Sequence, residues 1–264
     1  MVQAKISARQ ITKRYPVKGQ EFTALDRFDL EVGEGEFVCI VGPSGCGKST
    51  FLRILAGLYE PTAGELIIRR SSGLNGGAPK PLNSMIFQEY AIFPWRTVLD
   101  NVMFGLEMRN VARRERRAIA NAYLEKVGLR RYKDRYPYQL SGGMKQRVSI
   151  ARAFANDPEI LLMDEPFGAL DEQTKTLLQQ ELLRMWEEDR KTVVYITHSI
   201  EEAILLGDRV AVMTAQPGRN KHQLRVELPR PRDPKIKTTV RFTELCYEVW
   251  QGLESEVVKS METD

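Results

Sequence analysis

The stretch that decides the fold of this chain is Phe37-Val38-Cys39-Ile40-Val41-Gly42-Pro43-Ser44-Gly45-Cys46-Gly47-Lys48-Ser49-Thr50. Its first five residues form an apolar run of strand length, and the segment after the glycines is typical of a helix that ends near Gly57. The residues between them match the pattern G-x-x-x-x-G-K-[ST], in which glycines let successive backbone N–H groups turn toward an anion. The helix N-terminus adds a positive dipole, Lys48 adds a point charge for phosphates, and the Ser49 hydroxyl can bind Mg²⁺. This order of strand, glycine loop and helix predicts an α/β unit that binds a nucleotide through residues 42–50.

A second apolar run, at residues 160–163, predicts another buried strand, and it ends in two acids, Asp164 and Glu165. Asp164 is a candidate Mg²⁺ ligand through water, and Glu165 is a candidate to orient or deprotonate an attacking water. Two acids at a strand end also suit a solvated turn. The phosphate-binding pattern upstream favours the chemical interpretation.

The segment Leu140-Ser141-Gly142-Gly143-Met144 opens a predicted helix over 142–156 with exposed backbone N–H groups. Such a helix start is a second anion-binding surface in a chain that already has one. One nucleotide cannot easily use both surfaces if they lie far apart in a monomer. A dimer, in which this segment of each chain faces the nucleotide of the other, resolves the difficulty. For this pentapeptide alone, an ordinary serine N-cap is the competing interpretation.

The composition excludes several classes of protein. The 264 residues include 42% hydrophobic and 28% charged positions, which is typical of a globular chain, and the net charge of +4 is too small for a basic nucleic-acid footprint. The histidines, His198 and His222, and the three scattered cysteines offer no zinc pattern. No apolar run reaches the ~18 residues of a membrane span, and the first residues lack the apolar block that is typical of a signal peptide. We therefore expect a cytoplasmic chain in a reducing compartment.

The remaining pattern alternates strand-like and helical segments, as in α/β proteins. Further strands are expected at 4–11, 24–32, 64–70, 193–197 and 209–214. The stretch 98–140 reads as mostly helical, and further helices are expected at 172–190 and 240–258. The glycine- and proline-rich stretch 71–81 reads as an exposed loop whose role the sequence does not indicate. Near-continuous apolar strands predict a sheet covered on both faces.

Taken together and in order, these segments resemble one family, the ATP-binding cassette (ABC) ATPases. Residues 42–49 are similar to its Walker A motif, 140–144 to its signature, 160–165 to Walker B with the catalytic glutamate, and 169–171 to the D-loop. Gln88 matches the Q-loop glutamine, His198 the switch histidine, and Tyr15 the aromatic residue that stacks on adenine. The resemblance covers about residues 4–215.

The resemblance implies a P-loop NTPase fold, with a mixed-sheet core lobe at about 1–87 and 157–220, a helical subdomain at about 88–156, and a C-terminal extension with a helix from about 221. It also implies ATP hydrolysis with Mg²⁺ by two chains, identical or paralogous, that sandwich two ATP molecules. Ser49, Gln88 and Asp164 would surround the metal, and Ser141 and Gly143 would contact the γ-phosphate across the interface, with Gly142 in the same nucleotide-binding segment. Lys48, Gln88, Glu165 and His198 would then be the catalytic residues.

Finer resemblance, at residues 87–98, 164–171 and 216–219, is to importer ATPases for nitrate, sulfonate, taurine or bicarbonate. It implies a subunit at the cytoplasmic face of the inner membrane that works with transmembrane permeases and a solute-binding protein, not with nucleic acid. The DNA-repair type of ABC ATPase inserts a long coiled coil, and the ribosomal type carries two cassettes; neither feature is present. An exporter or lipid-transport ATPase remains an alternative, because it differs only in its partner.

Two surface questions stay open. Tyr90, Phe93 and Trp95 could line a groove for a short permease helix or belong to the core. The basic stretch 113–135 is most simply a solvated helical face, with contact to anionic lipid headgroups as a second interpretation. Cys39 is expected in the strand core, and Cys46 is expected to be a filler of the glycine loop that could make the protein sensitive to thiol reagents.

Overall fold

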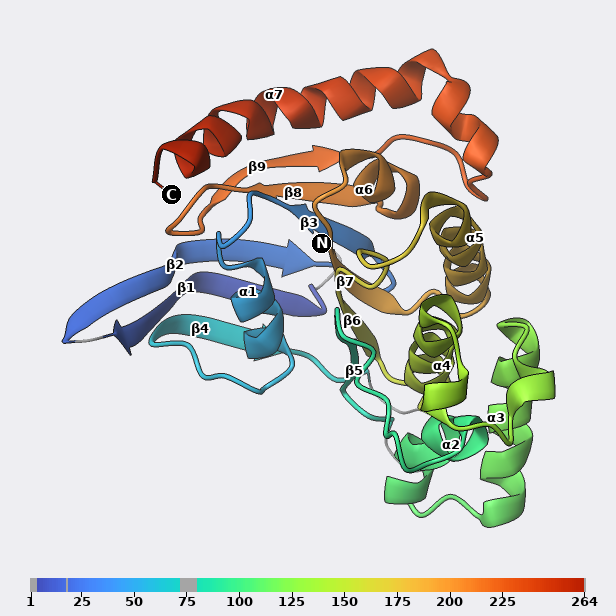
Figure 1. The fold of residues 1–264 in the computed structure, drawn as a ribbon. Coiled ribbons are helices and arrows are strands. Elements are labelled where there is room, and N and C mark those ends of the chain that lie inside the picture. The colour runs from blue at the N-terminus through green and yellow to red at the C-terminus, as the bar shows by residue number, and fades with distance from the viewer. Residues whose placement is uncertain (1–3, 18, 72–79, 264) are drawn as a thin grey trace. The chain divides into compact units, whose positions relative to one another are not determined.

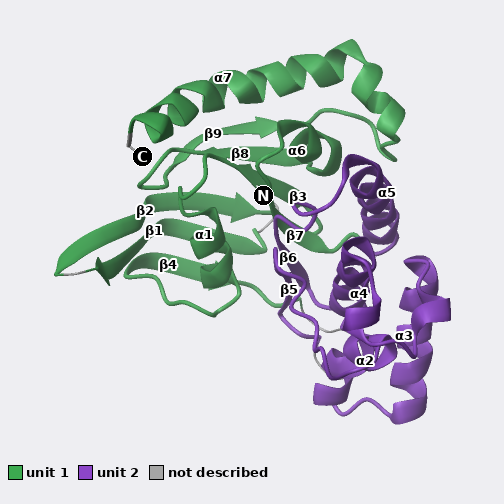
Figure 2. Ribbon diagram, in the orientation of Figure 1, with its two compact units in different colours: residues 1–72, 190–264 green, residues 73–189 purple. Residues whose placement is uncertain are grey.

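The computed structural model describes residues 4–17, 19–71 and 80–263, so most of the predicted loop at 71–81 lies outside the described residues. The chain forms two compact units, residues 1–72 with 190–264 (unit 1) and residues 73–189 (unit 2) (Figures 1 and 2). The boundaries expected for the helical subdomain, 88 and 156, both fall inside unit 2. The division into a core lobe and a helical subdomain remains a prediction.

Unit 1 contains an antiparallel sheet of three strands in the order β2-β1-β4. These are β1 (Ile6–Val17), β2 (Gln20–Val32) and β4 (Ala63–Ile68). β1 and β2 form a hairpin that is longer than expected, since it continues through Tyr15, opposite Phe22. Beyond Ile11 most of the side chains of β1 are at least partly exposed, so no apolar run signals the extension.

The second group of strands in unit 1 surrounds β3 (Phe37–Val41), whose five residues are all buried. β7 (Thr192–Ile196) and β8 (Arg209–Met213) pair with β3 in parallel on either side, and β9 (Asn220–Arg225) pairs with β8 in antiparallel. This mixture of directions is the mixed sheet that was expected. β9 itself was not expected, because its side chains are mostly exposed and polar.

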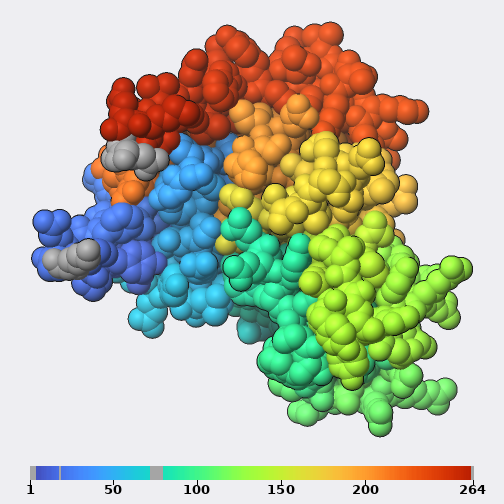
Figure 3. All heavy atoms as spheres, in the orientation of Figure 1, coloured from blue at the N-terminus to red at the C-terminus, as the bar shows by residue number. Residues whose placement is uncertain are grey.

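Three α-helices complete unit 1: α1 (Lys48–Leu55), α6 (Ile200–Leu206) and α7 (Val240–Thr263). α7 turns an apolar stripe inward, with Phe242, Leu245 and Val249 buried at helical spacing. α7 packs against β8, and at Gly252 a Cβ would lie at ordinary van der Waals distance, 3.7 Å, from the Val212 side chain. The space-filling view shows this C-terminal segment, in red, lying directly on the rest of the unit (Figure 3).

Unit 2 contains two parallel strands, β5 (Asn83–Ile86) and β6 (Ile160–Asp164). Its helices are α2 (Val98–Met108), α3 (Arg113–Lys126), α4 (Gly142–Ala155) and α5 (Glu172–Asp189). Thr97 caps α2, since its side chain accepts a hydrogen bond from the Asp100 N–H at 3.1 Å. In the part of the chain that the structure describes, no helix combines the length and apolar character needed to cross a membrane.

Candidate functional site

The glycine loop lies between β3 and α1 in unit 1, as the sequence predicts. Gly45 and Gly47 have φ angles of +73° and +101°, a conformation that side chains disfavour. A Cβ at Gly47 would lie 2.6 Å from the carbonyl oxygen of Ala24. Both positions therefore need glycine, and these two glycines of the motif allow the loop to adopt its conformation.

Lys48 is the first residue of α1, and only 6% of it is exposed. Its Nζ donates hydrogen bonds to the carbonyl oxygens of Gly42, at 2.8 Å, and Pro43, at 2.7 Å. A buried positive charge thus faces the interior of the loop, where it can neutralise a phosphate. Ser49 and Thr50 follow on α1 and are partly exposed.

Cys46 is buried within the loop, at 1% exposure. Burial raises the pKa of its thiol, and the neighbouring Lys48 charge opposes this shift without cancelling it. Because the thiolate is the reactive form, the structure argues against sensitivity to thiol reagents at this residue. Cys39 is fully buried in β3, as expected.

His198 and Tyr15 belong to the same unit as the glycine loop. His198 follows the end of β7, and since β7 and β3 are parallel, the histidine and the loop leave the sheet at the same edge. His198 is exposed in a turn fixed by its neighbours, because the Ser199 N–H donates to Thr197 Oγ1 at 3.0 Å. Tyr15 lies on β1 with its ring edge-on to Tyr59, at a centroid distance of 6.3 Å.

Unit 2 brings three further candidates to one edge of its strands. Gln88 follows the end of β5, while Asp164 ends β6 and Glu165 comes directly after it. The two strands are parallel, so all three residues lie at their carboxyl ends. Asp164 is 4% exposed, and Gln88 is exposed.

Glu165 adopts a left-handed backbone conformation with φ +43°, which is uncommon for a residue with a side chain. The turn that follows holds it, since the Gly168 N–H donates to the Glu165 carbonyl oxygen at 3.1 Å. Backbone strain of this kind clusters at functional sites and costs about 1–3 kcal/mol. No sequence signal predicted it.

The predicted signature lies at the start of α4 in unit 2. Ser141 caps the helix by accepting a hydrogen bond from the Met144 N–H at 3.4 Å. The interpretation of Ser141 as an N-cap is therefore confirmed, and its role in phosphate binding remains a prediction. A Cβ at Gly142 would lie 2.7 Å from the Tyr90 hydroxyl oxygen, and one at Gly143 would lie 2.8 Å from Thr174. Ser141, Gly142 and Gly143 border a cavity of about 460 Å³, which Asp171 of the predicted D-loop also lines.

A second cavity in unit 2, of about 500 Å³, lies between β5, α2 and α4. Phe93 lines it together with Phe87, Phe104 and Arg152. Trp95 is 72% exposed, which rules out a core position for this residue, and it contacts the Phe93 ring at 5.7 Å between centroids. Neither Trp95 nor Tyr90 is part of the lining.

The candidate residues are thus distributed over both units. Unit 1 carries Tyr15, residues 42–50 and His198, and unit 2 carries Gln88, residues 141–143, Asp164 and Glu165. Within the described residues, no group of three or more histidine, cysteine, aspartate or glutamate side chains could hold a metal ion. The chemical role of each candidate remains a prediction.

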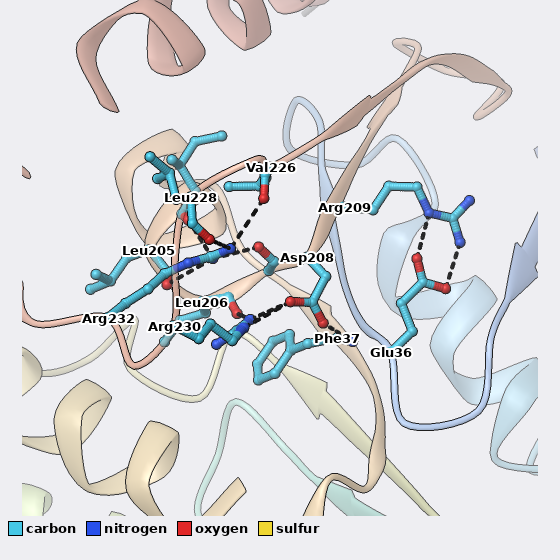
Figure 4. Close-up of polar contacts among 12 residues, drawn as sticks. Glu36, Phe37, Leu205, Leu206, Asp208, Arg209, Val226, Leu228, Arg230 and Arg232 are labelled. Atoms are coloured by element: carbon cyan, nitrogen blue, oxygen red, sulfur yellow. Dashed lines mark hydrogen bonds and ion pairs between the residues drawn. The ribbon is translucent and has the colours of Figure 1, made fainter. Parts of the chain in front are cut away.

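Two buried charged residues in the C-terminal segment escaped the sequence reasoning. Arg232 is 5% exposed and donates to carbonyl oxygens around the end of α6, including those of Leu205 at 3.2 Å and Gly207 at 2.6 Å (Figure 4). Next to it, Arg230 Nε donates to Asp208 at 2.8 Å (Figure 4). The second buried charged residue is Glu256 on α7, with 3% of it exposed. No local pattern marks these residues, because their partners are distant in the sequence.

Comparison with known proteins gives consistent matches. The family model described as ABC transporter matches residues 25–168. An uncharacterized ABC transporter ATP-binding protein of Methanocaldococcus jannaschii is 48% identical over 260 residues, which is 98% of this chain and 95% of the relative. The bicarbonate transport ATP-binding protein CmpC of Synechococcus elongatus is 44% identical over 257 residues, 96% of this chain and 37% of CmpC.

Among solved structures, the ABC transporter cassette MJ0796 aligns with a TM-score of 0.72 and 36% identity over 85% of this chain and 100% of that one. MJ0796 has been solved as a dimer, and also in a post-hydrolysis state bound to ADP and Pi. The α/β P-loop NTPase fold predicted from the sequence is confirmed.

Proposed function

Since this chain belongs to the ABC transporter family, as an ATP-binding subunit with ATPase activity, we propose that it energises the import of a small anion through separate transmembrane permease subunits. The observation that carries the catalytic part of this proposal is Lys48, a buried positive charge that faces the carbonyl oxygens of its own glycine loop. With ATP bound, the phosphate oxygens replace these carbonyls as partners of Nζ. The backbone N–H groups of residues 42–50, apart from Pro43, supply the remaining donors, and Tyr15 stacks on adenine.

Hydrolysis requires an oriented water and stabilisation of the phosphoryl charge. Glu165 accepts the proton of the attacking water, and His198 donates a hydrogen bond to the γ-phosphate. The position of Glu165 supports this assignment, because it directly follows the buried strand β6 and is adjacent to Asp164. Gln88, which follows the end of β5, would join them at the γ-phosphate.

The donor set fits Mg²⁺, since Ser49, Gln88 and Asp164 offer hydroxyl, amide and carboxylate oxygens, which are the ligands that this ion prefers. Asp164 is buried and comes at the end of a fully buried strand, which suits an ionised ligand paired with a cation. The ion would supply neutralisation of the phosphate charge.

We propose a dimer as the hydrolytic form, because the α4 N-terminus carries an anion-binding surface of its own. Ser141, Gly142 and Gly143 would contact the γ-phosphate bound to the other chain, and the cavity that they border provides the room. The dimeric cassette MJ0796 supports this arrangement. Identical and paralogous partner chains both satisfy it.

The permease partner has a fitting surface in the 500 Å³ cavity lined by Phe93, which is apolar and aromatic enough to receive a short amphipathic helix. We further propose that the chain acts on the cytoplasmic side of the inner membrane, with a solute-binding protein in the wider complex and without nucleic acid. The solute belongs to the nitrate, sulfonate, taurine or bicarbonate group, and the similarity to CmpC supports an anion of this kind.

Two experiments test the proposal. Phosphate release by the purified chain with Mg-ATP, compared with Lys48→Met, tests the ATPase part, and equal rates would overturn the assignment of the loop. Uptake of labelled bicarbonate, nitrate, sulfonate and taurine in a deletion strain tests the transport part. Loss of uptake of one anion, restored by the wild-type gene, supports import, whereas retained uptake with impaired efflux of a solute would show export.

A further inference from the structure

Glu256 is a buried carboxylate on the C-terminal helix α7. Its Oε2 accepts a hydrogen bond from the backbone N–H of Ala215 at 3.0 Å. Its Oε1 accepts from Lys221 Nζ at 2.8 Å and from Lys259 Nζ at 3.2 Å. Both oxygens are therefore engaged, and one of them binds the main chain of the loop after β8.

The charge of Glu256 is permanent at physiological pH. Burial pushes its pKa up, but the hydrogen bonds from Lys221, Ala215 and Lys259 outweigh burial and lower the pKa to about 2. The bond to Ala215 is thus charge-assisted, which is the stronger kind of hydrogen bond.

The loop that Glu256 holds, residues 214–219, is closed on itself by Thr214. The Thr214 N–H donates to the Arg219 carbonyl oxygen at 2.9 Å, and the Thr214 side chain accepts from the Arg219 N–H at 2.9 Å. The same hydroxyl donates to the Pro217 carbonyl oxygen at 2.9 Å. A restraint on Ala215 is therefore passed on to the whole loop.

Gly218, in this loop, lies directly against the phosphate-binding loop. A Cβ at Gly218 would be 2.1 Å from the carbonyl oxygen of Cys46, a distance that no side chain tolerates. The Gly218 N–H donates at 3.0 Å to the carbonyl oxygen of Ala24, the same oxygen that lies 2.6 Å from a Cβ position on Gly47. Three backbone segments thus pack in contact behind Cys46 and Gly47.

We propose that Glu256 is a positioning residue for the phosphate-binding loop: by fixing residues 214–219 from α7, it holds the backbone of Cys46 and Gly47 in the conformation that receives phosphate. The C-terminal helix thereby takes part in nucleotide binding without touching the nucleotide. This inference rests on the proposed function of residues 42–50.

The test compares Glu256→Ala with Glu254→Ala, a matched change on the exposed face of the same helix. Affinity for Mg-ATP is titrated with a fluorescent ATP analogue, at a temperature at which every variant is folded. We expect Glu256→Ala to weaken binding about tenfold, on the scale of one lost charge-assisted hydrogen bond, and to raise KM more than it lowers kcat. Glu254→Ala should bind as the wild type does. Unchanged affinity in a folded Glu256→Ala protein would overturn the proposal.

The variant Lys221→Ala distinguishes two roles of Glu256: positioning the phosphate-binding loop and simply anchoring α7 to the unit. This change removes one ion pair of Glu256 but leaves its bond to Ala215, so stability should fall while the affinity for Mg-ATP stays within about twofold. If Lys221→Ala weakens binding as much as Glu256→Ala does, the Ala215 contact is not the transmitting one.

Hydrogen exchange without nucleotide distinguishes failure of this inference from failure of the proposed function. We expect the backbone N–H groups of Gly42 and residues 44–47 to exchange at least about tenfold faster in Glu256→Ala than in Glu254→Ala. If exchange accelerates but neither protein binds ATP, the proposed function fails and the mechanical coupling stands. If exchange is unchanged while the wild type hydrolyses ATP, the coupling fails and the function stands.

Discussion

Lys48 Nζ lies 2.8 Å from the carbonyl oxygen of Gly42, so the lysine closes the very loop whose last glycine precedes it. Replacing it by Met keeps the length of the side chain and removes the charge. We expect Lys48→Met to lower ATP turnover by about 10²–10³-fold, since a positioned charge on the phosphates is lost. Phosphate release checks this, with Lys235→Met, an exposed lysine of the same unit, as the control. Turnover within twofold of the wild type would contradict the assignment.

Glu165→Gln should separate binding from hydrolysis. The amide keeps the shape of the side chain but cannot accept the proton from water, so turnover should fall by at least about 10²-fold. ATP binding should persist, and light scattering with Mg-ATP should show a dimer that the wild type forms only transiently. Glu172→Gln, an exposed change at the start of α5, should leave turnover unaltered.

His198→Ala exploits the fact that the chain has two histidines, both exposed. Turnover should fall by about 10²-fold or more, because a donor to the γ-phosphate is removed. The free energy of unfolding should change by less than about 0.5 kcal/mol, as is usual for an exposed side chain. His222→Ala, on β9, serves as the paired control. Equal activity of the two variants would exclude a catalytic role for His198.

Arg232→Met should destabilise the protein without altering the candidate site directly. The guanidinium is buried against carbonyl oxygens at the end of α6, and its loss leaves them unsatisfied (Figure 4). We expect a loss of at least about 2 kcal/mol in the free energy of unfolding. Denaturant titration measures it as a lower midpoint at constant slope, and Arg225→Met, at an exposed position, should shift the midpoint little.

Glu256 should make stability depend on pH in acid. Its pKa is about 2 in the folded protein and about 4.3 in an unfolded chain, so its stabilisation is complete above the unfolded value and is lost as the pH falls through 2. At neutral pH this amounts to about 3 kcal/mol. The difference in unfolding free energy between the wild type and Glu256→Gln should therefore shrink between pH 5 and pH 2. A difference that stays constant over this range would show that the carboxylate charge is not responsible.

Sequence reasoning worked where a motif specifies backbone conformation. Gly45 and Gly47 have the positive φ angles that the loop pattern requires, and the predicted strands at 37–41 and 193–197 correspond to the buried strands β3 and β7 (Thr192–Ile196). Such patterns report local constraints, so they can be read from neighbouring residues.

What the sequence could not supply depends on contacts between distant segments. Glu256 meets Ala215 across 41 residues, and Arg232 meets Leu205 across 27, with nothing in the local pattern to indicate either partner. β9 and the outer half of the β1–β2 hairpin were missed because mostly exposed strands lack apolar alternation. The left-handed backbone of Glu165 is a property of the turn that follows, and no residue type in this segment predicts it.

The anchoring of Arg232 and Glu256 also decides where this protein can be cut or fused. The motifs of the candidate nucleotide site all end before residue 200, so a fragment trimmed at that point would still contain every one of them. Such a fragment would lose β8, β9 and the 214–219 loop, together with the Arg232 guanidinium and the Glu256 carboxylate. Excision should therefore retain the chain at least through Lys259, the outermost ion-pair partner of Glu256, and affinity tags belong beyond it. The C-terminal segment is therefore a structural part of the domain, and protein engineering should leave it intact.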